Sequence, residues 1–177
     1  MSKAVLISIR PEWCQKIMGG RKTIEVRKTR PKMNPPFKCY IYRSVQGGVI
    51  GEFVCDHIFE RIVRVGASCE APKYCICDWN MDCTPLDTLL ADACLTKDEL
   101  EKYLDGGVGY GWHISNLKIY DTPKELIEFH TWKKCKSCNK SGYESTACIY
   151  DENCIIPAAI TKAPQSWCYV EEEIWND

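Results

Sequence analysis

Residues 20–27 are Gly-Arg-Lys-Thr-Ile-Glu-Val-Arg, and this stretch is the most informative part of the chain about its fold. The stretch fits the pattern G-x-K-x-x-E-x-R, with Lys22, Glu25 and Arg27 at the charged positions. On a strand, Glu25 and Arg27 share one face because they are two residues apart. Lys22 joins them only from a turn that leaves Gly20. The spacing therefore allows an ammonium, a carboxylate and a guanidinium to converge in one pocket.

The spacing leaves two interpretations of this charged group open. In the first, Lys22 is desolvated beside a cation, loses part of its proton affinity and activates water or attacks, while Glu25 shuttles the proton. These two residues are then the candidate catalytic pair. In the second, Lys22, Glu25 and Arg27 form an exposed salt-bridge ladder worth ~0–1 kcal/mol.

The sequence around this motif predicts short strands and local helices. Pro11 occupies a typical first helical position, and Gly19-Gly20 ends that helix. Further helices are expected after Thr84 and Thr96, where a capping Thr precedes an acidic residue. Strands are expected at residues 4–9, 23–27, 37–43, 49–65 (with a bend near Cys55), 109–120 and 167–170. Because strands and helices do not alternate regularly, the pattern favours an α+β fold.

Length, composition and charge narrow the class of protein. The 177 residues fit one domain, and 45% hydrophobic with 27% charged residues exclude global disorder. No run of about 18 apolar residues predicts a spanning helix, and the first apolar run is too short for a signal peptide, so a cytoplasmic location is expected. Residues 10–43 contain ten lysines and arginines against two acidic residues, whereas residues 52–105 contain five against twelve. The first segment is suited to attracting an anion.

The N-terminal third resembles the ASCH domain family, whose members are small mixed β-barrels of the PUA-like superfamily. The resemblance rests on Leu6, Ser8-Ile9-Arg10-Pro11, a following aromatic residue, a short helix that ends in Gly, and the motif Lys22-x-x-Glu25-x-Arg27. It covers residues 4–65 well and extends more loosely over 109–120 and 165–172. It implies one domain over residues 1–177, with flanking helices, an irregular and helical insertion at 66–105, and a cysteine-rich insertion at 131–160.

The resemblance implies a cleft that binds RNA or a modified nucleobase or nucleotide. Lys22, Glu25 and Arg27 line this cleft, and the basic segment guides a phosphate backbone toward it. PUA-like modules stack bases on aromatic walls, and a stacked base gains about 1–3 kcal/mol. The residues expected to bind the ligand are therefore Arg10, Trp13, Lys22, Glu25, Arg27, Tyr42, Ser44, Trp112 and Trp167.

A second activity follows from the same resemblance. Some small ASCH proteins are amidohydrolases that deacetylate acetylated cytidine with a lysine, a threonine and a distant glutamate. Lys22 matches that lysine, Glu25 stands in the position of the threonine, and Glu52 is a candidate for the glutamate. The alternative function is therefore an amidohydrolase acting on an acylated nucleoside.

Cysteines near the C-terminus have the spacing of a structural zinc site. The set is Cys135, Cys138, Cys148 and Cys154. Four thiolates complete a tetrahedral zinc shell, and the two-residue gap in the first pair lets one turn aim both sulfurs at the metal. We expect a zinc-knuckle-like insertion, since the stretch holds few large apolar residues and a metal would stabilise it directly. Free thiols in a loop are the alternative.

The remaining cysteines give weaker signals. Cys69, Cys75, Cys77 and Cys83 are interpreted as buried or incidental thiols, with a second metal site as the alternative, and the others as small hydrophobic residues. A third function also stays open, in which the cysteine-rich insertion docks a protein partner and the rest of the domain is a scaffold.

Overall fold

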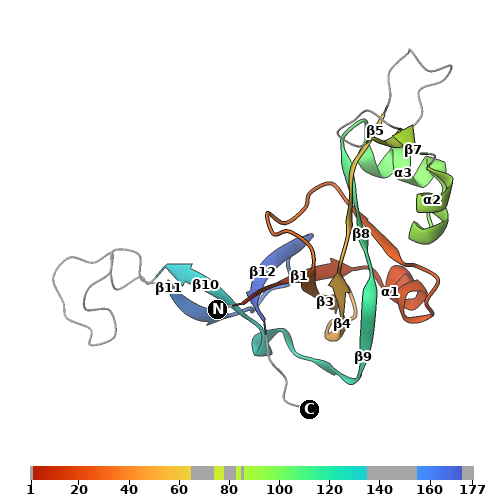
Figure 1. Ribbon diagram of the computed structural model, residues 1–177. Coiled ribbons are helices and arrows are strands. Elements are labelled where there is room, and N and C mark those ends of the chain that lie inside the picture. The colour runs from red at the N-terminus through yellow and green to blue at the C-terminus, as the bar shows by residue number, and fades with distance from the viewer. Residues whose placement is uncertain (1, 65–73, 78–82, 85, 135–154, 173–177) are drawn as a thin grey trace, which may run out of the picture.

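The computed structural model describes residues 2–64, 74–77, 83–84, 86–134 and 155–172, which form a mixed α+β fold (Figure 1). The helices are α1 (Pro11–Met18), α2 (Asp87–Ala93), α3 (Lys97–Leu104) and the 3-10 turn η1 (Leu126–Glu128). None of the described helices is long and apolar enough to cross a membrane.

Five strands form the first sheet, in the order β12-β1-β3-β4-β9. Their bounds are β1 (Lys3–Ile9), β3 (Phe37–Arg43), β4 (Val49–Cys55), β9 (Ser115–Lys124) and β12 (Trp167–Glu171). The central pair β1 and β3 is parallel, and the other pairs are antiparallel. The apolar run of β1 is buried almost throughout, as expected for a central strand.

A second five-stranded sheet has the order β2-β8-β5-β6-β7. Its strands are β2 (Ile24–Arg27), β5 (Ile58–Arg64), β6 (Tyr74–Cys77), β7 (Cys83–Thr84) and β8 (Gly109–His113). A separate antiparallel ribbon pairs β10 (His130–Lys134) with β11 (Ile155–Ala159). In Figure 1 this ribbon projects from the side of the molecule opposite α2 and α3.

The two sheets are connected at two places, where one strand continues after a bend into a strand of the other sheet. β4 passes into β5 across Asp56-His57, and β8 passes into β9 across Ile114. The expected bend near Cys55 is therefore confirmed. The strand orders are those of open sheets, so the expectation of a closed barrel is not met among the described residues.

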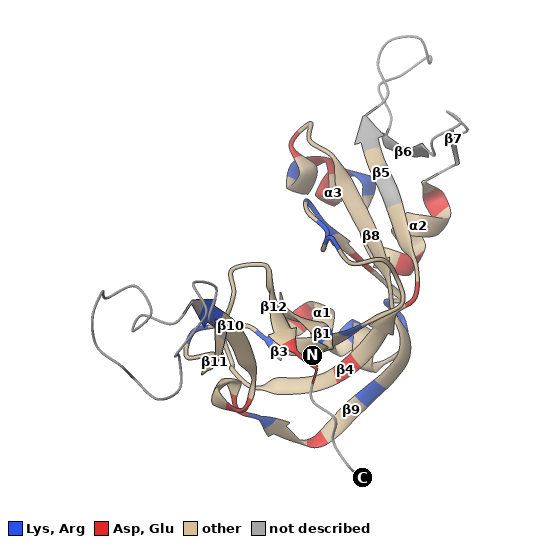
Figure 2. Cartoon of the chain, turned by 60° about the vertical axis from the view of Figure 1, so that its left-hand side comes forward, with Lys and Arg blue, Asp and Glu red and all other residues tan. Residues whose placement is uncertain are grey.

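The core consists of separate clusters. In the first, Cys14 and Ile17 of α1 pack on the first sheet together with Phe53 and Trp112. The second lies between α2, α3 and the other sheet. Both of these helices carry acidic residues (red in Figure 2), as the acidic balance of residues 52–105 indicated.

Most expected elements are present, with two differences. α2 starts at Asp87 with Leu86 as its N-cap and has no side-chain cap, so Thr84 does not cap it. By contrast, Thr96 and Glu99 form the expected capping box of α3. β10 and β11 were not anticipated within the cysteine-rich segment. The four predicted zinc ligands lie outside the described residues.

Candidate ligand-binding site

A pocket of about 920 Å³ opens between the first sheet, α1, β2 and α3. Its floor contains Lys22 and Glu25, which are only 3% and 6% exposed. Ser8 of β1 and the segment Ala163–Ser166, which precedes β12, form another part of the lining. Elements from the start, the middle and the end of the chain therefore meet at this pocket.

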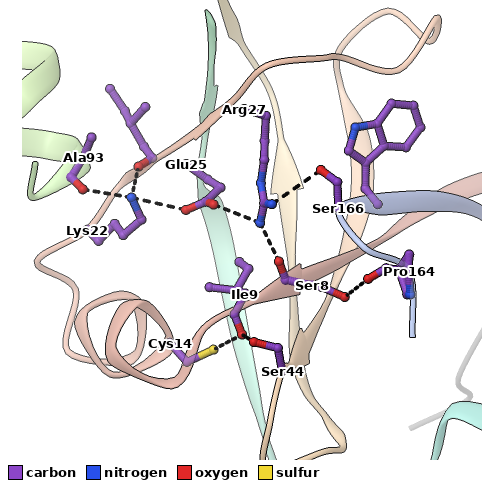
Figure 3. A network of polar contacts seen from close by, with 12 residues as sticks. Ser8, Ile9, Cys14, Lys22, Glu25, Arg27, Ser44, Ala93, Pro164 and Ser166 are labelled. Atoms are coloured by element: carbon purple, nitrogen blue, oxygen red, sulfur yellow. Dashed lines mark hydrogen bonds and ion pairs between the residues drawn. The ribbon is translucent and has the colours of Figure 1, made fainter. Parts of the chain in front are cut away.

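The Lys22 ammonium lies at the centre of a buried network (Figure 3). Its Nζ donates to the backbone oxygens of Ile24 and Ala93, both at 2.8 Å, and lies 3.2 Å from Glu25 Oε2. An ammonium has three N–H donors, so each donor has an acceptor. Because Ala93 is the last residue of α2, Lys22 also attaches that helix to the motif strand.

The turn before β2 places Lys22 on the same side as Glu25. Gly20 adopts a φ of +69°, a conformation favoured by glycine, and the backbone N–H groups of Arg21 and Lys22 both donate to Lys16 O. Lys22 therefore precedes the regular pleat of the strand, as the spacing required. The prediction that the three charged head groups of the motif converge is consistent with this geometry.

Arg27 completes the network. Its Nη2 lies 3.0 Å from Glu25 Oε1 and donates to Ser8 O at 2.6 Å, while Nη1 donates to Ser166 Oγ at 3.5 Å. Each oxygen of Glu25 thus has one cationic partner. A carboxylate oxygen accepts about two hydrogen bonds, so Glu25 retains capacity for donors of a ligand.

Seven of the nine predicted ligand-binding residues line this pocket. They are Arg10, Trp13, Lys22, Glu25, Arg27, Tyr42 and Ser44. The Trp13 ring is contacted by two cations, with Lys16 Nζ at 4.2 Å and Lys22 Nζ at 5.1 Å from its centroid. Such contacts fix the orientation of the indole at the pocket wall.

Trp112 and Trp167 lie elsewhere. Trp112 is fully buried in the first core cluster and packs edge-on against Phe37. Trp167 packs beside Trp112 with ring centroids 5.9 Å apart, and its indole N–H donates to Thr29 Oγ1. Neither ring lines the pocket. The structure therefore does not place Trp112 and Trp167 where an aromatic wall for a ligand was predicted. Both are core-facing aromatics of the strands around the site.

α3 contributes a wall of the pocket that was not predicted from the sequence. Glu99, Lys102 and Tyr103 line the pocket with Leu95, which precedes the helix. The i, i+3, i+4 spacing of the three helical residues puts them on one face of the helix. This spacing is the sequence feature from which a shared wall could have been predicted. Desolvation raises the pKa of Tyr103, so its phenol stays neutral and offers an aromatic surface.

Other candidate groups are engaged elsewhere. Glu52 accepts a hydrogen bond from Tyr120 OH at 2.6 Å, lies 3.7 Å from Lys38 Nζ and does not line the pocket. Burial raises the pKa of Cys14 to about 11, so this thiol of α1 stays protonated near neutral pH. Within the described ranges, no three His, Cys, Asp or Glu side chains are grouped to hold a metal ion.

The described residues form a small mixed α+β domain with a pocket lined by Lys22, Glu25 and Arg27. The sequence profile of the ASCH domain matches residues 7–98, just over half of the chain, and the chain therefore belongs to the ASCH domain family. A search of curated proteins returned no significant match.

Solved structures with a similar fold come from Zymomonas mobilis. A crystal structure of its ASCH protein is 16% identical and superposes with a TM-score of 0.56, covering 96% of this chain and 88% of that one. A crystal structure of a serine-to-alanine mutant of that protein gives the same identity and TM-score and covers 89% of its chain. At this identity the likeness concerns the fold.

Proposed function

We propose that the chain binds single-stranded RNA, or a modified nucleobase or nucleotide, in the pocket lined by Lys22, Glu25 and Arg27. The observation that carries the proposal is the buried floor of fixed charges beneath an aromatic wall. RNA-binding modules splay bases out, stack them on aromatic rings and form hydrogen bonds with their edges. Glu25 has unused acceptor capacity for the N–H groups of such an edge, and Trp13 and Tyr42 offer ring surfaces.

The rim of the pocket supports a polyanionic ligand. Arg10 and Lys102 are exposed and line the opening, one from the start of α1 and the other from α3. Neither forms an ion pair among the described residues. Exposed cations at an opening attract phosphates, and the resulting affinity falls with salt. The pocket volume is at the upper end of the range for ligand sites.

The geometry favours binding over amide hydrolysis. A nucleophilic or basic Lys22 must release a proton, yet all three donors of its ammonium are held by acceptors. Glu25 is likewise held by a cation at each oxygen. Lys22 and Glu25 therefore support the proposal as fixed floor residues that orient a ligand rather than as reacting groups.

A binding titration tests the proposal. Fluorescein-labelled RNA pentamers of random sequence are titrated with the protein at several salt concentrations while anisotropy is recorded. We expect saturable binding whose logarithmic affinity decreases linearly with the logarithm of salt concentration. Arg10→Ala should reduce that slope by about 0.7, the value for one phosphate contact on a single strand.

Lys32→Ala is the matched control, because Lys32 is exposed and lies outside the pocket lining. It should leave the slope nearly unchanged. Absence of binding, or equal effects of Arg10→Ala and Lys32→Ala, would contradict a site at this pocket. A separate assay measures turnover of acetylated cytidine, with Lys22→Arg as the control because it keeps a cation beside Glu25. Turnover by the wild type that is lost in a folded Lys22→Arg variant would favour hydrolysis over the binding role.

A further inference from the structure

Val45 is an apolar residue that projects into solvent at the edge of the pocket. It lies in the turn between β3 and β4, lines the pocket and is 96% exposed. The floor residues Lys22 and Glu25 are almost fully buried, so Val45 belongs to the rim. Its neighbours in the turn, Ser44 and Gln46, are polar. The isopropyl group contributes nothing to the core from this position.

The backbone at Val45 is also unfavourable for this residue type. Its φ is +70°, and the N–H of Gln46 donates to Ser44 O at 2.8 Å to close a three-residue turn around it. A β-branched residue with positive φ is an outlier, whereas glycine and asparagine adopt this conformation readily. The same turn uses glycine at Gly47 and Gly48, whose φ values are +82° and +84°. A strained, exposed apolar residue beside a binding pocket indicates a role in contacting the ligand.

α3 also places an exposed side chain with an apolar surface in the pocket lining. Tyr103 is 39% exposed and lines the pocket next to Lys102. Val45 and Tyr103 therefore each provide an exposed apolar or aromatic surface in the lining of the pocket that also contains the exposed cations Arg10 and Lys102. Sites for single-stranded nucleic acid combine cations that follow the backbone with apolar or aromatic surfaces for successive bases.

We propose that Val45 and Tyr103 contact the bases that flank the base held in the pocket, while Arg10 and Lys102 bind the adjoining phosphates. The inference rests on the proposed function and specifies its ligand. The ligand is then a single-stranded RNA segment of several nucleotides, and a free nucleoside or mononucleotide occupies only the floor of the site.

The test compares two probes and three variants. The probes are random-sequence RNA pentamers and an equimolar mixture of the four ribonucleoside 5′-monophosphates. Val45→Ala and Val45→Asn should weaken pentamer binding by about three- to tenfold, the loss expected for one apolar side-chain contact, and leave mononucleotide binding unchanged. Val45→Ile keeps the apolar branch and should retain wild-type affinity for pentamers.

Thermal unfolding separates this effect from a folding defect. Asn tolerates positive φ, so Val45→Asn should melt at the wild-type temperature or up to about 4 °C higher. Unchanged pentamer affinity in Val45→Ala and Val45→Asn, or equal losses for both probes, would overturn the inference. Wild-type protein that binds mononucleotides as tightly as pentamers would also overturn it while leaving the proposed function standing. Wild-type protein that binds neither probe would contradict the proposed function itself. Pentamer binding without measurable mononucleotide binding supports the inference.

Discussion

At the scale of single residues, the Lys22 ammonium determines how the site is built. Taking a charge out of water is unfavourable unless partners replace its hydration. Lys22 has three such partners, and they belong to the strand β2, the helix α2 and the carboxylate of Glu25. One side chain thus contributes charge to the pocket floor and attaches α2 to the strand β2.

Replacing Lys22 by Met should destabilise the protein strongly. The substitution leaves Glu25 buried beside a single cation and removes the donor to the carbonyls of Ile24 and Ala93. Breaking a buried ion pair on one side costs about 3–5 kcal/mol. Urea unfolding measures the loss, and Lys97→Met is the control, because the Lys97–Glu101 pair is exposed and should contribute less than about 1 kcal/mol. Equal losses for both variants would show that the Lys22 network is a surface ladder.

The sequence predicted the charged residues of the site better than its aromatic ones. The motif spacing allowed the head groups of Lys22, Glu25 and Arg27 to converge but also allowed an exposed ladder, and the resemblance to the ASCH domain assigned them to a cleft. Trp112 was assigned to a wall and lies in the core, since the face of a strand that borders a pocket depends on the packing of distant elements. Tyr103 was missed for the same reason: its helix reaches the pocket through contacts that local spacing does not encode.

At the scale of elements, the start of α3 is fixed by its capping box. The Thr96 hydroxyl accepts from Glu99 N at 3.2 Å, and Glu99 Oε2 accepts from Thr96 N at 2.8 Å. Thr96→Ala should lower the free energy of unfolding by about 1 kcal/mol, whereas Thr96→Ser keeps the cap and should change it little. Urea unfolding of both variants provides the measurement. If Thr96→Ser is as destabilising as Thr96→Ala, the hydroxyl is not the stabilising group.

The bend between the two sheets contains a carboxylate–imidazole hydrogen bond whose contribution to stability depends on pH. Asp56 Oδ1 lies 2.6 Å from His113 Nδ1, and this hydrogen bond lowers the pKa of Asp56 below its usual value of 3.8. A lowered pKa of the folded state means that the stabilisation is present above the unfolded value and is lost as pH falls through the folded value. The pair is exposed, so its contribution is less than about 1 kcal/mol.

Asp56→Asn should therefore be slightly less stable than the wild type near neutral pH. The difference between the two proteins should shrink as the pH falls below about 4. Urea unfolding across this pH range gives both free energies of unfolding. A difference that stays constant with pH would assign the effect to packing at the bend.

Elements with strong local signals were predicted well, and the others were not. α1 and α3 carry Pro11 and the Thr96 box at their starts, and both begin where the sequence indicated. α2 begins at Asp87 although Thr84 offers a cap, because its start is set by packing of Leu86 and Leu89 in the second cluster. β10 and β11 pair across a segment of low periodicity, and such pairing depends on a partner that is distant in the sequence.

At the scale of the whole molecule, β10 and β11 bring together two parts of the chain separated by the cysteine-rich segment. Their ladder ends at the pair Lys134 and Ile155, so the two strands leave it as neighbours. The pairing of β10 with β11 is compatible with the zinc site predicted at Cys135, Cys138, Cys148 and Cys154. Holding the two ends of a segment together lowers the entropic cost of bringing four ligands to one metal.

Metal analysis of the purified protein should return about one zinc per chain. Cys138→Ser should reduce this content sharply, whereas Cys168→Ser, which changes a partly buried thiol of β12 that packs among apolar residues, should not. Protein without zinc after purification free of chelators, or equal losses in both variants, would contradict the four-cysteine site.

We propose that RNA binds in the pocket above Lys22, Glu25 and Arg27. Two-dimensional ¹H–¹⁵N spectra of the labelled protein during titration with random-sequence RNA pentamers test it most directly. We predict shifts of the Trp13 indole N–H signal and of backbone signals in β2, α3 and the β3–β4 turn, saturating together. Shifts confined to other surfaces, such as β9 or the β10–β11 ribbon, or no shifts at saturating RNA, would contradict the claim.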